Sequence, residues 1–168
     1  ERKRLEREKK KKLRAPKTGT SAKGRDGTTR HGMVISYSKY HAPEITIVDI
    51  DNRILVATRE HKSDFKTYWE FPGGKLNKNE TPEDCLIREI KEEINIDISK
   101  ACIAPIGFSS FSYSHLHVVL MLYISRKWKG EPFPREGNKL KWIRKSELKS
   151  LKMPEANKSL IPLILDII

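Results

Sequence analysis

The chain has 168 residues and a formal net charge of +12, and these values limit its class. A chain of this length can bury the core of one ordinary domain. No apolar run approaches the ~20 residues that cross a bilayer, and two cysteines, Cys85 and Cys102, are too few for a disulfide framework. We therefore expect a monomeric, cytoplasmic protein with reduced thiols and no membrane partner.

The positive charge is concentrated at the N-terminus. Residues 1–31 hold 13 Lys/Arg and 4 Asp/Glu, whereas the other 137 residues hold 21 and 18. Because this segment has almost no apolar content, we expect it to be disordered. We divide the chain into a basic extension, residues 1–32, and a folded domain, residues 33–168. The extension is either a solvated or non-native segment, or a tail that contacts nucleic acid nonspecifically by releasing counterions.

Folded structure is predicted from about residue 44 onward. Ile45, Ile47 and Ile50 mark a short first strand, and Pro43 starts it or places it at a sheet edge, where we expect the sheet to be imperfect. A turn is predicted at residues 51–52. Further strands are predicted at residues 54–57, 69–71, 103–108, 117–124 and 141–143, and helices at residues 82–94 and 160–168.

The order of these elements predicts the fold class. The strand at residues 117–124 is mostly apolar, so we expect it to lie at the centre of a sheet. Strands and helices interleave without a strict βαβ alternation. The expected class is therefore α/β (α+β), with a mixed β-sheet between helices.

The helix predicted at residues 82–94 has a well-specified start and two distinct faces. Thr81 is a good N-cap, Pro82 suits the first helical position, and Asp84 completes a box-like cap. One face is apolar, with Leu86, Ile90 and Ile94, and another is acidic, with Glu89, Glu92 and Glu93. Two like charges ~4 Å apart repel by ~1 kcal/mol in water and by ~4 kcal/mol at an effective dielectric constant of ~20. A bound Mg²⁺ would offset this repulsion; the alternative is a solvated acidic face on which Arg88 pairs with Glu92.

A spaced motif runs through this helix: Gly74, five residues, Glu80, seven residues, and then Arg-Glu-Ile-Lys-Glu-Glu-Ile-Asn-Ile over residues 88–96. It resembles the Nudix box, G-x5-E-x7-R-E-U-x-E-E-x-G-U, in which U is aliphatic. Only Asn95 departs from it, and Asn is the residue next most tolerant, after Gly, of the left-handed backbone that ends a helix. The resemblance implies a Nudix hydrolase with an α/β/α sandwich fold and a Mg²⁺ cofactor, for which Mn²⁺ can substitute.

The resemblance also implies roles for single residues. The expected metal ligands are Glu89, Glu92, Glu93 and the backbone carbonyl of Gly73, with Glu136 as a further carboxylate. Arg88 and Glu80 would form an ion pair that orients the helix and its carboxylates. Gly73, Gly74 and Lys75 would bind the substrate, because the glycines let the backbone approach the phosphates. Attack at the β-phosphorus would release pyrophosphate, with Glu89 or Glu136 as the general base.

Segments outside the motif resemble the MutT group of this family, the bacterial enzymes that remove 8-oxo-dGTP. These segments are residues 69–75, 128–133, 136–137 and 154–157, and the likeness covers about three quarters of the chain. By this likeness, Asn157 would hydrogen-bond the purine edge, Arg59 would touch the nucleotide and Phe71 would line the base pocket. The alternatives are a helix N-cap for Asn157, a surface charge for Arg59, a core position for Phe71 and an ordinary loop acid for Glu136.

The resemblance leads to one preferred function and two alternatives. The preferred function is hydrolysis of 8-oxo-dGTP to 8-oxo-dGMP and pyrophosphate, which sanitises the nucleotide pool. The same chemistry could act on ADP-ribose, a dinucleotide polyphosphate or a 5′-triphosphate RNA end. A Nudix-like nucleic-acid-binding module ranks below both, because the acidic residues are retained. Leu116, where the MutT enzymes have a basic residue, is a departure from the pattern.

Overall fold

The computed structural model describes residues 38–58, 67–114, 116–135 and 137–168, so the predictions for residues 1–37, Arg59 and Glu136 lie outside the described part. The strands are β1 (Ser38–Ile47), β2 (Ile54–Thr58), β3 (Trp69–Glu70), β4 (Ala104–Ser112), β5 (Leu116–Ser125) and β6 (Leu140–Ile143). The helices are α2 (Pro82–Ile94), α3 (Glu155–Lys158) and α4 (Ile161–Ile167), with 3₁₀ helices at Lys100–Cys102 and Lys145–Ser150.

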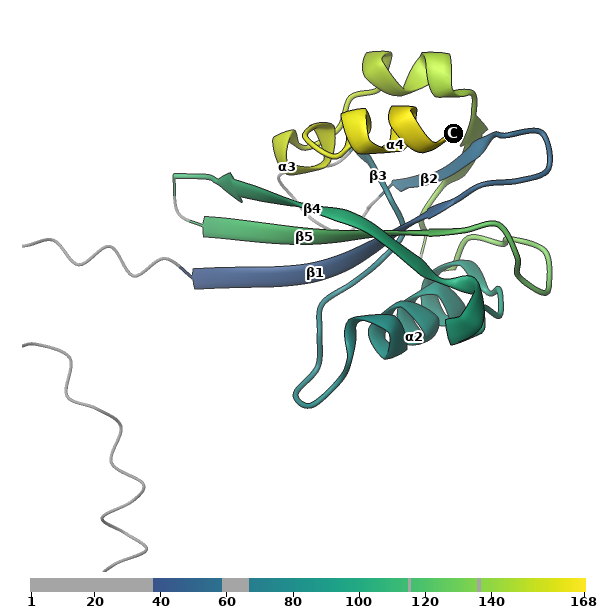
Figure 1. Ribbon diagram of the computed structural model, residues 1–168, viewed down its shortest axis with the longest axis horizontal. Helices are drawn as coiled ribbons and strands as arrows, with labels where there is room; N and C mark the ends of the chain where they lie inside the picture. The colour runs from purple at the N-terminus through teal and green to yellow at the C-terminus, as the bar shows by residue number, and fades with distance from the viewer. Residues whose placement is uncertain (1–37, 59–66, 115, 136) are drawn as a thin grey trace, which may run out of the picture. The chain divides into compact units, whose positions relative to one another are not determined.

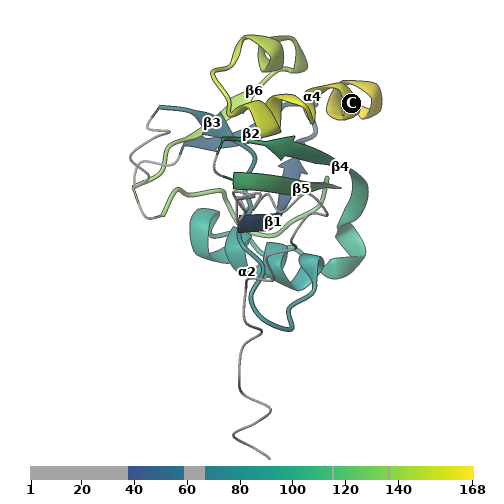
Figure 2. The same ribbon diagram turned by 90° about the vertical axis from the view of Figure 1, so that its left-hand side faces the viewer.

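The strands form two three-stranded sheets. The first, in the order β1-β5-β4, is mixed: β5 pairs with β1 in parallel and with β4 in antiparallel. This confirms the predicted mixed sheet and the central place of the apolar strand. The second sheet, in the order β3-β2-β6, is antiparallel and was not predicted as separate. Helix α2 covers one side of the first sheet, and α3 and α4 lie on its other side (Figures 1 and 2).

The first strand differs from its prediction in length and composition. It spans ten residues rather than a few, and it pairs with β5 in an unbroken parallel register. The imperfection expected on this side is therefore not found; the sheet has its irregularity in β4, between Pro105 and Gly107. Ile50 was wrongly assigned to the strand, because it lies in the following turn with 98% of its surface exposed.

Pro43 fits inside β1 because of the side on which its missing N–H would lie. The Pro43 carbonyl accepts a hydrogen bond from the Gly74 N–H (3.1 Å). Two residues further along β1, the Ile45 N–H donates to the Pro72 carbonyl (2.8 Å). Alternate residues of a strand direct their polar groups to the same side, so the missing donor faces residues 72–74 and not β5. The predicted edge position of Pro43 in its sheet is confirmed.

Helix α2 has the predicted ends and the predicted buried face. The Thr81 side chain accepts a hydrogen bond from the Asp84 N–H (3.2 Å), and Asn95 caps the other end with φ 60° and ψ 26°. The three residues of the predicted apolar face, Leu86, Ile90 and Ile94, are fully buried in a cluster that also holds Ile45 and Ile47 of β1. Packing on β1 therefore directs the acidic face of α2 away from the core.

Candidate active site

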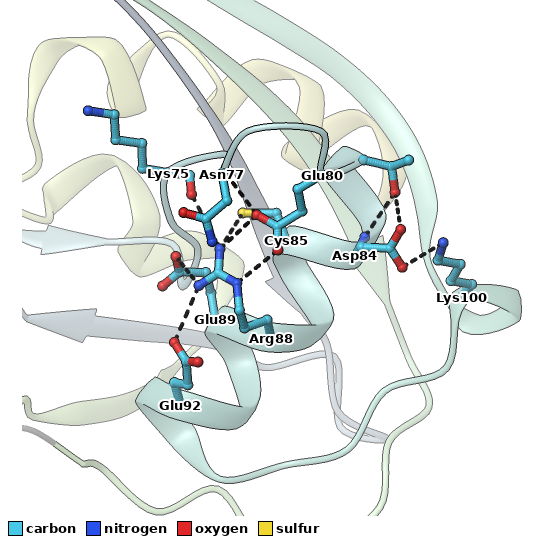
Figure 3. A network of polar contacts seen from close by, with 10 residues as sticks. Lys75, Asn77, Glu80, Asp84, Cys85, Arg88, Glu89, Glu92 and Lys100 are labelled. Atoms are coloured by element: carbon cyan, nitrogen blue, oxygen red, sulfur yellow. Dashed lines mark hydrogen bonds and ion pairs between the residues drawn. The ribbon is translucent and has the colours of Figure 1, made fainter.

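Arg88 is the centre of the polar network on α2 (Figure 3). Its guanidinium donates to both oxygens of Glu80, from Nε to Oε1 at 2.8 Å and from Nη2 to Oε2 at 2.9 Å. Nη1 contacts Glu89 Oε1 at 2.7 Å and Glu92 Oε2 at 3.3 Å. Nη2 also donates to the Lys75 carbonyl at 3.3 Å. The Glu80–Arg88 pair expected from the motif is therefore present, and so is the Arg88–Glu92 contact of the alternative interpretation.

The network changes the acidity of its members. Hydrogen bonds from Arg88, and next the Asn77 backbone N–H, lower the pKa of Glu80 from an ordinary value of 4.5 to about 2. The same contact with Glu80 is the main cause that raises the pKa of the Arg88 guanidinium. Burial raises the pKa of the Cys85 thiol to about 12, so this cysteine stays protonated and unreactive. At neutral pH the ion pair is thus fully charged.

The glycine loop, residues 72–74, lies between β1 and α2. Its backbone pairs with β1 through Glu44 and Gly73, which form an antiparallel bridge. A Cβ atom on Gly74 would collide with the Cγ and Cδ atoms of Glu89, so the absence of a side chain at Gly74 makes room for this carboxylate. The backbone of the predicted phosphate-binding loop and the first predicted metal ligand are therefore in direct contact.

The donors of this site suit a hard divalent cation. Arg88 contacts three carboxylates, so the guanidinium and these carboxylates together carry two more negative than positive charges. Carboxylate oxygens are ligands that Mg²⁺ prefers. In the part of the chain that the structure describes, no three acidic, His or Cys side chains converge on one ion. The acidic groups of the motif are therefore gathered around Arg88, and a cation held by Glu89 and Glu92 would compete with the guanidinium for their oxygens.

The other residues expected at the site lie around this network. Glu93 is half-buried near the end of α2, and its backbone carbonyl accepts a hydrogen bond from the Arg135 N–H (2.9 Å). The Lys75 side chain extends away from Arg88 (Figure 3). Phe71 is only 1% exposed and belongs to the core cluster that also holds Ala156. A core position, one of the two interpretations of Phe71, is what the structure shows.

Asn157 is not the N-cap of the last helix, so that interpretation is wrong. It lies inside α3, whose N-cap is Pro154, and the residue is only 3% exposed. Its Nδ2 atom donates to Glu44 Oε2 at 2.6 Å. Sequence reasoning missed Glu44, although a carboxylate within the apolar segment of residues 42–48 was a signal that could have drawn attention to it.

One cavity of about 420 Å³ lies at the far end of α2, away from the glycine loop. Its lining residues are Asp97, Ile98, Ser99, Cys102, Lys127, Trp128 and Lys129. None of the residues predicted for the active site is among them.

Comparison with known proteins assigns this arrangement to a family. A NUDIX domain matches residues 41–164, about three quarters of the chain. The chain belongs to the Nudix family. It is 36% identical over 100 residues to the 8-oxo-dGTP diphosphatase of Proteus vulgaris, which covers 60% of this chain and 88% of that protein. It is also 36% identical over 114 residues to the enzyme of the same name from Haemophilus influenzae, which covers 68% of this chain and 82% of that protein.

Solved structures agree with this assignment. A structure from a study of MutT from Aliivibrio salmonicida and Vibrio cholerae matches with a TM-score of 0.64 and 26% identity, covering 78% of this chain and all of that one. The resemblance found in the motif is thus confirmed, and the chain is a Nudix hydrolase, an enzyme of nucleotide substrates from a family that uses divalent metal ions. No described helix of this Nudix chain is long and apolar enough to span a bilayer.

Proposed function

We propose that this Nudix hydrolase converts 8-oxo-dGTP to 8-oxo-dGMP and pyrophosphate, with Mg²⁺ as a cofactor that Mn²⁺ can replace. The observation that carries the proposal is the 36% identity to two 8-oxo-dGTP diphosphatases over 88% and 82% of their lengths. The contact of Glu89 with Gly74 supports it, since this contact brings an acidic helix next to a loop whose two glycines have no side chains. Such an enzyme would remove an oxidised precursor before it enters DNA.

The proposed mechanism divides the work among a few groups. The cation would be held by Glu89, Glu92, Glu93 and the Gly73 carbonyl, with Glu136 as a further ligand, and it would neutralise phosphate charge and acidify water. Arg88, held by Glu80, would keep the helix carboxylates in place. A carboxylate oxygen of Glu89 or Glu136 would take the proton of the attacking water. The water oxygen bonds to the β-phosphorus, and the bond from that phosphorus to the α–β bridging oxygen breaks.

Substrate contacts would come from residues on both sides of the glycine loop. Gly73, Gly74 and Lys75 would contact the phosphates, and Arg59 the nucleotide. Phe71, being buried, would support the base pocket from beneath. Asn157 would read the purine edge, because an amide offers both a donor and an acceptor.

The substrate assignment is tested with a panel of nucleotides and Mg²⁺. The panel holds 8-oxo-dGTP, dGTP, dATP, ADP-ribose, a diadenosine polyphosphate and a 5′-triphosphate RNA. We expect the highest kcat/KM for 8-oxo-dGTP, with a mononucleotide and pyrophosphate as products. Equal kcat/KM values for 8-oxo-dGTP and dGTP would refute the assignment.

The metal site is tested by Glu93→Gln. This variant should abolish Mg²⁺-dependent turnover and leave the fold intact, because it removes a charged ligand without changing the size of the side chain. Turnover and calorimetric titration with Mn²⁺ provide the measurement, and circular dichroism checks the fold. Glu83→Gln, the same change on the same helix but at an unspecified position of the motif, is the matched control. Retained turnover in Glu93→Gln would count against the proposed ligands.

A further inference from the structure

Two buried polar side chains meet between β1 and α3. Glu44 and Asn157 are 6% and 3% exposed, and they are 113 residues apart in the sequence. Asn157 Nδ2 donates to Glu44 Oε2 at 2.6 Å. A carboxylate away from water needs hydrogen-bond partners, so this short contact is a specific feature of the interior.

The backbone of Glu44 joins this pair to the active site. Glu44 and Gly73 form an antiparallel bridge, and a Cβ atom on Gly73 would lie 2.8 Å from Glu44 Cα. The next residue, Gly74, contacts Glu89. Strand β1 therefore carries Glu44, one member of the buried pair, and pairs with the predicted phosphate-binding loop along its edge.

The chemistry of the pair determines the orientation of the amide. A carboxylate only accepts hydrogen bonds, whereas the Asn157 amide has a donor end and an acceptor end. Turning the amide over would place Oδ1 against Glu44 Oε2, two acceptors that repel each other. Glu44 therefore keeps the Asn157 Nδ2 atom on the side that faces Glu44. The two groups that remain for a ligand, Oδ1 and the second N–H of Nδ2, then have fixed positions.

We propose that Glu44 is a specificity-determining residue for the purine base, because it fixes the order of donor and acceptor on Asn157. This inference rests on the function proposed above. In the fixed order, Oδ1 accepts from the N7–H of 8-oxoguanine and the free N–H donates to O6. An amide turned over matches the N6 donor and N7 acceptor of adenine instead. Unmodified guanine has acceptors at both O6 and N7 and matches neither order.

The first test is Glu44→Gln, which keeps the size of the side chain. The new amide can donate or accept, so both orientations of Asn157 become available. We expect the ratio of kcat/KM for 8-oxo-dGTP to kcat/KM for dATP to fall about tenfold or more. Thr46→Val is the matched control, because Thr46 is fully buried two residues further along β1 and its hydroxyl has no partner within the described residues. An unchanged ratio in folded Glu44→Gln overturns the proposal.

The second test exchanges the two groups in the double variant Glu44→Gln, Asn157→Asp. The pair keeps its size, its charge and a hydrogen bond, which protects the fold if the single variant is unstable. Residue 157 then presents only acceptors, so we expect a preference for 8-oxo-dATP, whose N6 and N7 both carry hydrogens. The wild-type order of substrates in this variant overturns the role of Glu44. If the wild type itself does not favour 8-oxo-dGTP over dGTP, the proposed function fails. If its preference survives Glu44→Gln, only the Glu44 assignment fails; if it also survives the double change, the base contact proposed for Asn157 fails with it.

Discussion

The two glycines of the loop at residues 72–74 are required for different steric reasons. A Cβ atom on Gly73 would collide with the backbone of β1, at the Pro43 carbonyl and at Glu44 Cα. The three atoms nearest to a Cβ atom on Gly74 would all belong to the flexible side chain of Glu89. Gly73 therefore matters for the fold, whereas Gly74 matters for the place of one carboxylate.

This difference predicts that alanine at Gly74 affects mainly catalysis, whereas alanine at Gly73 affects mainly stability. Gly74→Ala should lower kcat about 100-fold with little change in melting temperature, because Glu89 is displaced by an ångström or more. Gly73→Ala should lower the melting temperature, because the backbone has to move. Steady-state kinetics and thermal denaturation of both variants provide the measurement. A Gly74→Ala enzyme with wild-type kcat would show that the position of Glu89 is not critical.

Glu80 makes the stability of this enzyme sensitive to acid. Its pKa is about 2 in the folded chain against an ordinary 4.5, because Arg88 binds the charged form. A lowered pKa stabilises the fold above the unfolded value, and this stabilisation is lost as the pH falls from about 4.5 toward 2. Glu80→Gln should therefore reduce the difference in the free energy of unfolding between pH 6 and a pH of about 2. Urea midpoints measured across this range test it, and identical pH dependence in both proteins would contradict the prediction.

At the scale of elements, the bounds predicted for α2 are confirmed, whereas those of β1 are not. The ends of α2 follow from local groups: the Thr81 cap at the start and the left-handed Asn95 at the end. The bounds of β1 depend instead on β5, its parallel partner about 78 positions later in the chain. The residues before Pro43 have no regular apolar pattern, so pairing, and not composition, extends the strand back to Ser38.

The end of α2 gives a prediction at this scale. Asn95 adopts φ 60°, a backbone conformation that costs a residue with a Cβ atom about 1–2 kcal/mol. Asn95→Ala should destabilise the protein by about 1 kcal/mol more than Asn95→Gly. Both variants lose the contact from Arg135 Nη2 (2.6 Å), so their difference isolates the backbone effect. Denaturant unfolding measures it, and equal stabilities would show that the helix end rearranges.

At the scale of the whole molecule, the charge of the chain divides into two parts. Residues 1–31 carry +9 of the net +12. The matched Nudix domain, residues 41–164, begins after this segment. The monomeric state, the cytoplasmic location and nucleic-acid contact by residues 1–32 stay predictions.

Removal of residues 1–31 separates the two parts. We expect unchanged kcat/KM for 8-oxo-dGTP, because every residue proposed for the site follows this segment. Any binding of the full chain to RNA should be lost, and in the full chain it should weaken as salt rises, because it releases counterions. Fluorescence anisotropy at two salt concentrations, together with turnover, provides the measurement. A truncated enzyme with reduced turnover would place part of the active site in the extension.

Local sequence was sufficient for the family, the acidic helix and the Glu80–Arg88 pair, because caps, helical periodicity and motif spacing act over a few neighbouring residues. Tertiary structure alone decided the second sheet, the length of β1 and the pairing of Glu44 with Asn157. These features join segments far apart in the chain, and no pattern within either segment specifies its partner. The proposed recognition of the base depends on such a contact, whereas the proposed metal site depends mainly on one helix.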